Sequence, residues 1–124
     1  MMIRIDPLSP TPLNEQIKSG LRGLIARGVL KPGEPAPTIR PLAESLKVNP
    51  NTVARAIREL VLEGVLETKR GEGTVVAAAA PRKAADGLAE VRDGLREALR
   101  QARRGGLSWD DITLLTRRAE KEDI

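Results

Sequence analysis

Residues 38–63 read TIRPLAESLKVNPNTVARAIRELVLE, and this stretch decides the fold because it predicts two short helices joined by a tight turn. Thr38 is suited to cap the first helix, and Pro41 falls in its first turn, where no backbone donor is lost. Asn49 and Pro50 open the second helix in the same way. The apolar side chains of that helix recur at helical spacing: Val53, Ile57, Leu60 and Val61. This order of elements is typical of a helix-turn-helix.

The residues on either side extend the pattern. Upstream, Thr11 and Pro12 predict the start of a helix whose apolar positions are Leu13, Ile17, Leu21, Leu24 and Ile25. Further upstream, Ile3 and Ile5 alternate with a polar residue, which predicts a short strand. Downstream, residues 65–69 and 74–76 flank a Gly-rich tip and predict a β-hairpin. Three helices followed by a hairpin predict a winged helix-turn-helix.

The remaining residues predict a linker and two more helices. Residues 78–85 are mostly small and are interpreted as a linker. A helix with apolar residues spaced 3-4-3-4 follows and ends at Gly105. Ser108 and Asp111 predict a capping box for a last helix. The expected fold is therefore mainly α with a small β-hairpin: residues 1–77 as a winged helix-turn-helix domain, 78–85 as a linker, and 86–124 as a C-terminal helical hairpin.

Composition narrows the range of functions. The 124 residues include no Cys and no His, which excludes zinc-finger ligation, thiolate or imidazole catalysis, and disulfides. No nucleophile–base pair is visible, so we expect no enzyme, and no metal or other cofactor. Trp109 is the single aromatic residue, which disfavours stacking on single-stranded nucleic acid. The net charge of +4 is weak evidence for an anionic partner.

The second helix of the helix-turn-helix would contact DNA bases through its N-terminal residues. Asn51 is suited to pair with adenine, and Arg55 with guanine or with phosphate. Arg58, one turn further on, is more suited to the backbone. Free N–H groups at the two helix N-termini, near residues 39–40 and 51–52, would hold phosphate. The basic hairpin tip with its glycine would reach along the DNA backbone or into the minor groove. The candidate DNA-binding residues are Thr38, Arg40, Pro50, Asn51, Thr52, Arg55, Arg58, Lys69, Arg70 and Gly71.

Six short motifs occur in the order found in the GntR family of bacterial repressors, which this chain resembles. They are PLNEQI (12–17), GVLKPG (28–33), IRPLA (39–43), NPNTVARA (49–56), LVLEG (60–64) and GEGTVV (71–76). The fourth motif and the short tail resemble the YtrA-type subfamily. The resemblance implies a winged helix-turn-helix fold and regulation of transport or membrane-stress genes.

The resemblance also implies roles for particular residues. Arg40 matches an arginine that grips DNA at the start of the second helix of the fold. Asn51 and Thr52 match recognition-helix contacts, and Gly71 matches the wing glycine. Pro50 and Ala54 stand where many members carry arginine, so the base preference of this chain does not follow from the family. Pro41 and Ala36 also replace commoner residues.

The tail is interpreted as a dimerisation element. About 40 residues are too few to enclose a typical ligand pocket, and two short amphipathic helices do not bury their apolar stripes alone. We therefore expect a homodimer on a palindromic operator with half-sites spaced by whole helical turns. No small-molecule effector is required by the sequence. The candidate dimerisation residues are Leu88, Val91, Leu95, Leu99, Trp109, Ile112 and Leu115.

Other interpretations remain open at this point. Arg40, Arg55 and Arg58 would also fit a solvated surface, with Glu44 and Glu59 nearby as ion-pair partners. The arginine row of the tail is more typical of a solvated helix face than of a phosphate site. The row consists of Arg92, Arg96, Arg100, Arg103 and Arg104.

A winged helix that binds a protein partner, without specific DNA binding, is the alternative function. The balanced charge of residues 39–76 would be its evidence. With no export signal and no apolar run long enough to span a membrane, we expect a soluble cytoplasmic protein without membrane contact.

Overall fold

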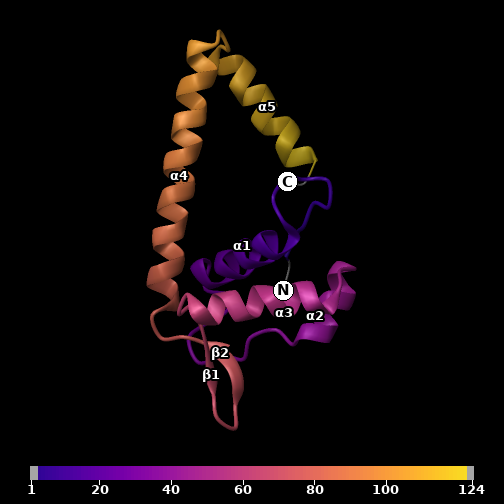
Figure 1. The fold of residues 1–124 in the computed structure, drawn as a ribbon. Coiled ribbons are helices and arrows are strands. Elements are labelled where there is room, and N and C mark those ends of the chain that lie inside the picture. Colours follow the sequence, from indigo (N-terminus) through magenta and orange to yellow (C-terminus); the bar gives the residue numbers. More distant parts are fainter. Residues whose placement is uncertain (1–2, 123–124) are drawn as a thin grey trace. The chain divides into compact units, whose positions relative to one another are not determined.

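The computed structural model describes residues 3–122, and within them the chain forms five helices and one two-stranded antiparallel sheet (Figure 1). The elements in order are α1 (Leu13–Ala26), α2 (Ile39–Leu46), α3 (Pro50–Leu62), β1 (Leu66–Lys69), β2 (Gly73–Val76), α4 (Ala80–Arg104) and α5 (Trp109–Lys121). The mainly helical fold with a small hairpin, predicted from the sequence, is confirmed. The chain divides into two compact units, one ending at Asp86 and the other beginning at Gly87.

The first unit is built around the contact of α1 with α3. α1 buries one apolar stripe, and α3 buries a second stripe against it. The innermost side chains are Ile17, Leu21, Leu24 and Ile25 of α1 and Val53, Ala56, Ile57 and Leu60 of α3. Burying stripes of this kind is the main source of stability in a small helical domain. The packing fixes α3 along its inner side and leaves its outer side to solvent.

The turn between α2 and α3 is short and well defined. Lys47 takes a left-handed conformation (φ 57°), which ends α2. The amide of Val48 then donates to the carbonyl of Ala43 at 3.0 Å, and Val48 packs against the core. Asn49 caps α3 by accepting a hydrogen bond from the amide of Asn51 at 2.8 Å, with Pro50 as the first helical residue. The predicted helix-turn-helix is thereby confirmed.

The hairpin is held by a third extended segment. β1 and β2 pair in the register Leu66 with Val76 through to Lys69 with Gly73. Residues 33–36 run along the other edge of β2: the amide of Gly33 donates to the carbonyl of Val76 at 2.8 Å, and that of Ala36 to Thr74 at 2.9 Å. Pro35 lies between these two donors, where its missing N–H is not needed. This pairing ties the hairpin to the body of the unit.

Three expectations about local structure were wrong. Ile3 and Ile5 form no strand; both are half-buried against the core without pairing to any described strand. Helix α1 begins at Leu13 with Pro12 in the N-cap position, one residue later than Thr11 and Pro12 predict. Residues 78–85 were expected to be a linker, but α4 already begins at Ala80.

The first two turns of α4 belong to the first unit. Ala80 and Ala84 are buried in its core. The ammonium of Lys83 donates to the carbonyl of Glu63 at 2.9 Å, which satisfies a carbonyl at the C-terminal end of α3. The sequence pattern of these alanines predicted a linker. Their small side chains instead let α4 approach the core closely.

Gly20 and Gly23 of α1 offer a matched test of this packing. A Cβ at Gly20 would lie 2.5 Å from Cγ2 of Ile3, whereas one at Gly23 would meet no described atom within 4 Å. We expect Gly23→Ala to raise the free energy of unfolding by about 0.5–1 kcal/mol through helix propensity. Gly20→Ala should lose that gain because it must displace Ile3. Urea unfolding of both variants is the measurement, and equal stabilisation by the two would contradict the packing of Ile3.

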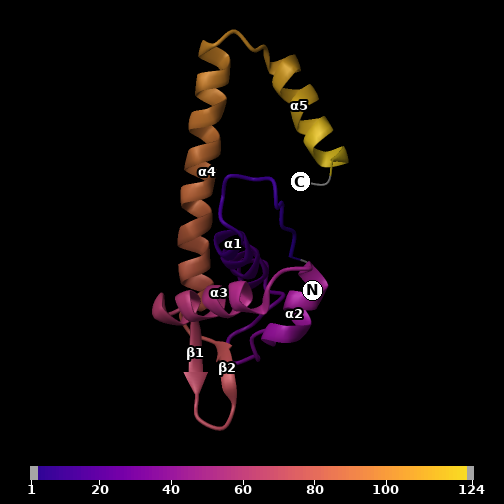
Figure 2. The same cartoon turned by 45° about the vertical axis from the view of Figure 1, so that its right-hand side comes forward.

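The second unit contains the rest of α4 and α5. The two helices meet at the turn around Gly105 and Gly106 and diverge from it (Figure 1, Figure 2). Ser108 accepts a hydrogen bond from the amide of Asp111 at 3.1 Å, and Asp111 accepts one from the amide of Ser108 at 2.8 Å. The predicted capping box is confirmed, and these hydrogen bonds hold the carboxyl pKa of Asp111 below its ordinary value.

Candidate nucleic-acid interface

The outer side of α3 carries three of the predicted contact residues. Asn51, Arg55 and Arg58 are spaced four and three residues apart, so they lie on one helix face, and all three are exposed. Thr52, beside them, is half-buried, and Pro50 is exposed at the start of the helix. Long polar side chains on the solvent face of a helix that is packed along its other side are the geometry that groove insertion requires.

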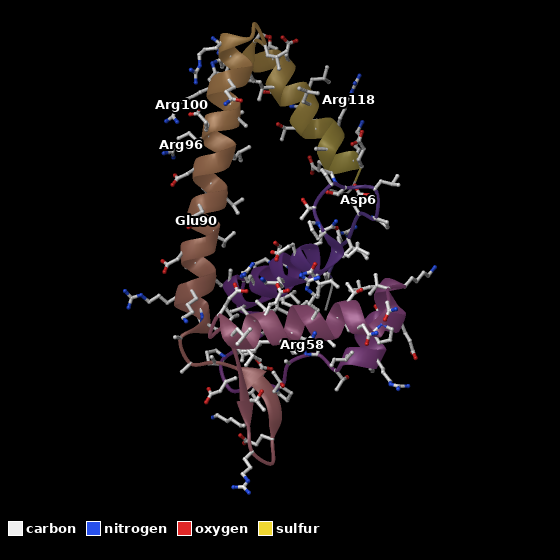
Figure 3. The ribbon with its side chains drawn as sticks, in the orientation of Figure 1. Asp6, Arg58, Glu90, Arg96, Arg100 and Arg118 are labelled. Atoms are coloured by element: carbon white, nitrogen blue, oxygen red, sulfur yellow. The ribbon has the colours of Figure 1, made fainter. Side chains whose placement is uncertain are left out.

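The two arginines of this face differ in their surroundings. Arg55 donates from Nε to Oε1 of Glu59 at 2.9 Å, although its side chain is still 66% exposed. Arg58, which is labelled in Figure 3, is exposed and makes no ion pair with any residue that the structure describes. The ion-pair interpretation left open for both arginines therefore applies to Arg55 alone.

Glu59 belongs to a polar cluster between α1 and α3. Lys18 donates from Nζ to Glu59 at 2.9 Å and to Glu63 at 2.6 Å, and its side chain is only 7% exposed. Asn14, also buried, donates from Nδ2 to Oε1 of Glu59 at 3.1 Å. Arg22 pairs with Glu63 from the next turn of α1. A buried ammonium is tolerated here because α3 and its C-cap supply two carboxylates to it.

The cluster shifts the pKa values of Lys18, Glu59 and Glu63 toward the charged forms. Hydrogen bonds from Lys18 and then Arg55 hold the carboxyl pKa of Glu59 below its ordinary value. Burial raises the pKa of Glu63, but the hydrogen bonds from Lys18 and Arg22 outweigh it and the net shift is downward. Burial likewise lowers the pKa of Lys18, yet the carboxylates outweigh it and the net shift is upward. The two glutamates contribute stability that is lost as the pH falls through their lowered pKa values.

Asn14 and Lys18 were not singled out in the sequence, although a signal was present. Both fall on the stripe of α1 that Ile17 and Leu21 define, at the i and i+4 positions. Polar residues on an otherwise buried stripe predict a buried polar partner on the facing helix.

The sequence predicts free N–H groups at the N-termini of both α2 and α3, but among the described residues the structure leaves them free only at α2. At α3, the amide of Asn51 is bonded to the Asn49 side chain and that of Thr52 to the Asn49 carbonyl at 3.0 Å. The expectation of free N–H groups there was wrong, because the turn and cap at Asn49 use both donors. At α2, Thr38 occupies the N-cap position, but its side chain makes no capping hydrogen bond with the residues described. The amides of Ile39 and Arg40 have no partner within residues 3–122.

Arg40 and the hairpin tip complete the predicted set. Arg40 is exposed on the first turn of α2, without an ion pair to Glu44. Lys69, Arg70 and Gly71 are exposed at the tip, where Gly71 takes a φ of 82°. An L side chain rarely adopts this conformation, so glycine is required for the turn itself.

A groove of about 630 Å³ runs between α3 and the hairpin. Arg55 and Arg58 line it from α3, and Thr68 and Thr74 line it from β1 and β2. Ile39 lines its α2 end. The structure therefore brings part of the outer side of α3 and the hairpin to one concave surface. The two threonines are polar contributors that sequence reasoning missed, because β-strand threonine is ordinary in any hairpin.

The second unit exposes the predicted dimerisation residues. Val91, Leu95 and Trp109 are 66%, 61% and 58% exposed, and Leu99 and Ile112 are half-buried. Leu88 and Leu115 are also exposed, and within its described residues α5 buries no side chain. Arg103 lies over the Trp109 ring, 5.2 Å from its centroid, which is a cation–π geometry. An apolar stripe of this length is unusual on a surface that nothing covers.

The arginine row of the tail is largely a solvated face. Arg100 and Arg104 each pair with Glu97 at 3.2 Å, while Arg96 and Arg100 extend outward along α4 (Figure 3). Exposed pairs of this type contribute little to stability.

Within residues 3–122, no group of acidic residues is placed to hold a metal ion, and none of the described helices is long and apolar enough to cross a membrane.

Comparison with known proteins gives a consistent result. The sequence pattern of "Bacterial regulatory proteins, gntR family" matches residues 13–76. The chain is 37% identical over 112 residues to HTH-type transcriptional repressor YtrA of Bacillus subtilis. The aligned region covers 90% of this chain and 86% of that protein.

Two solved structures extend the comparison. YtrA from Sulfolobus acidocaldarius, a GntR-family transcription factor, is 37% identical with a TM-score of 0.60, over 80% of this chain and 98% of that one. AraR(DBD) in complex with operator ORX1 is 33% identical with a TM-score of 0.53, over 60% of this chain and 92% of that one.

Proposed function

Because this chain belongs to the GntR family of bacterial regulatory proteins, we propose that it is a transcriptional repressor that binds a palindromic DNA operator as a homodimer. The predicted resemblance to YtrA-type members is confirmed as well. The relatives compared above are transcriptional regulators rather than enzymes.

The observation that carries the proposal is the outer face of α3. Asn51, Arg55 and Arg58 are exposed on one side of a helix whose opposite side is buried in the core. In this proposal the N-terminal half of α3 enters the major groove, where Asn51 reads adenine and Arg55 reads guanine. Thr52 and Pro50 contact the groove wall at the helix start. Arg58, without an ion pair among the described residues, contacts phosphate.

Phosphate would be held at two further places. At the start of α2, a phosphate would be held by the exposed Arg40 and by the amides of Ile39 and Arg40, which have no partner within residues 3–122, with Thr38 next in sequence. At the hairpin tip, Lys69, Arg70 and Gly71 reach the DNA backbone or the minor groove. The proposed binding site therefore spans α2, α3 and the hairpin, all within the first unit.

The uncovered stripe of the second unit supports the dimer. In this proposal the stripe packs against the same stripe of a second copy, with Trp109 as an anchor. A symmetric pair of α3 helices requires a palindromic operator. The proposed domains are residues 1–77 for DNA binding and 86–124 for dimerisation. A cytoplasmic location follows from the DNA partner, and the proposal includes no cofactor or effector.

Replacing Arg40 tests the DNA contact. Arg40→Ala is expected to weaken operator binding by about 10-fold and to reduce the slope of log affinity against log salt by about one, since one phosphate contact is lost. The free energy of unfolding should not change, because Arg40 is exposed. Titration of an operator duplex at several salt concentrations is the measurement.

Arg27→Ala is the matched control. It removes the same charge at an exposed position beyond the end of α1, outside the proposed interface. Equal operator affinity for Arg40→Ala and the wild-type protein would count against the proposed contact.

Selection of bound duplexes from a random pool would identify the operator sequence. The proposal expects palindromic sequences with half-sites spaced by whole helical turns. A protein that enriches no sequence and binds no duplex at low salt would instead be a protein-interaction module, and the proposal would be wrong.

A further inference from the structure

Two arginines one turn apart on α3 are held in different ways. Arg55 is bonded through Nε to Glu59, whereas Arg58 has no ion pair within the described chain. A guanidinium bonded at Nε keeps its two terminal nitrogens available, and its plane is fixed by the bond already made. The difference between the two arginines is therefore one of orientation and not of charge.

Glu59 is itself immobilised from α1. Its Oε1 accepts from Asn14 as well as from Arg55, and its Oε2 accepts from Lys18. Asn14 and Lys18 are 7% and 6% exposed, so neither donor is free to move with solvent. A carboxylate bonded at both oxygens to two buried donors has one orientation, and Arg55 takes its orientation from that carboxylate.

Orientation matters for only one kind of DNA contact. Guanine offers two acceptors in the major groove, and an arginine recognises them when both terminal nitrogens lie in the plane of the base. A phosphate accepts from many directions, so a mobile arginine serves as well there. Ordering the side chain before binding also removes part of the entropy cost of a specific contact.

We propose that Glu59, fixed by Asn14 and Lys18, is a positioning residue that sets base specificity by orienting Arg55, whereas Arg58 supplies affinity without specificity. The inference rests on the proposed DNA-binding function. It assigns to the α1–α3 polar cluster a role in recognition in addition to its role in packing. Because Arg55 stays 66% exposed while bonded, the terminal nitrogens remain accessible to DNA.

The test compares affinity for the selected operator with affinity for a scrambled duplex of equal length, at one salt concentration. The ratio of the two is the specificity. Glu59→Ala is expected to lower this ratio about 10-fold, as expected for a weakened arginine–guanine contact. Arg58→Ala should weaken binding to both duplexes equally and reduce the salt slope by about one. Glu90→Ala removes the same charge from an exposed position of α4 and should leave the ratio unchanged.

A double-mutant cycle isolates the positioning role. If Glu59 acts through Arg55, then Glu59→Ala combined with Arg55→Ala should have the same ratio as Arg55→Ala alone. If Glu59 instead repels phosphate, Glu59→Ala would change the operator affinity by the same factor in the wild-type protein and in the Arg55→Ala variant. Such additivity, or an unchanged ratio in Glu59→Ala, would overturn the inference.

Asn14→Ala provides a second variant in case Glu59→Ala does not fold. It removes one of the two donors of α1 that hold Glu59 and keeps the charges intact. It should lower the ratio by a smaller factor of about three, because Lys18 still holds the other carboxylate oxygen. An unchanged ratio for a folded Asn14→Ala would also count against the inference. Failure of the wild-type protein to distinguish the two duplexes would contradict the proposed function itself, so the two failures are distinguishable.

Discussion

A Leu95→Asn variant is expected to be a monomer at concentrations where the wild-type protein is a dimer. Leu95 lies at the middle of the exposed stripe of α4 and is 61% exposed in the single chain. In a symmetric interface each substitution counts twice, so losing the burial of one leucine per copy weakens the dimer by about 3–6 kcal/mol. Sedimentation at several concentrations is the measurement.

Operator binding should weaken with the dimer. A monomer contacts one half-site and loses the linkage to the second, so its affinity for a full palindrome should fall on the order of 100-fold or more. Affinity for a single half-site should change little, because the binding unit itself is intact.

Leu114→Asn is the matched control for this variant. Leu114 is also exposed, at 55%, but lies on a different face of α5 from Ile112 and Leu115. It should leave the dimer unchanged. A Leu95→Asn protein that stays dimeric would show that the stripe is not the interface.

The second large effect is expected in the core. Leu60 of α3 is fully buried in the core of the first unit, and Leu60→Ala should lower the free energy of unfolding by about 2–5 kcal/mol through lost burial and the cavity left behind. For a domain of this size the loss is a large share of total stability. Urea unfolding followed by circular dichroism is the measurement.

Leu62, two residues further along the same helix, is 86% exposed. Leu62→Ala has the same chemistry in the same helix and should change stability by less than about 0.5 kcal/mol. Similar losses in the two variants would mean that α3 is packed differently from the structure described above.

Local sequence signals predicted most of the fold correctly. Asn49-Pro50 and the Ser108–Asp111 box are complete within a few residues, so the start of each helix follows from the sequence alone. The hairpin likewise follows from the glycines that its tip needs. Where the evidence for an element is local, the sequence is sufficient.

The errors concern features that depend on distant residues. Ile3 and Ile5 alternate like a strand, but no strand within residues 3–122 pairs with them. Both pack against the core instead, with Ile3 beside Gly20 of α1. The alanines of residues 78–85 look like a linker until the core that Ala80 and Ala84 enter is known. One further error is local: the two donors at the start of α3 that were expected to be free are bonded to Asn49.

The candidate site was predictable in its residue types and less so in its geometry. The sequence assigns Arg55 to guanine or phosphate and Arg58 to the DNA backbone, but it does not show how Arg55 is oriented. That orientation depends on Glu59 and on the α1 side chains that hold it. The partners of Glu59 lie 45 and 41 positions away in the chain. No spacing rule within α3 reveals them.

The segment around Pro35 has a consequence for how the protein behaves at high concentration. An unpaired sheet edge is a template on which chains polymerise. Here residues 33–36 occupy one edge of β2, and the proline in that segment offers no donor to a further strand. The opposite edge, β1, has only four residues, two of which, Glu67 and Lys69, are charged. The hairpin is thereby protected from fibril-like aggregation, while self-association remains available to the helices of the tail.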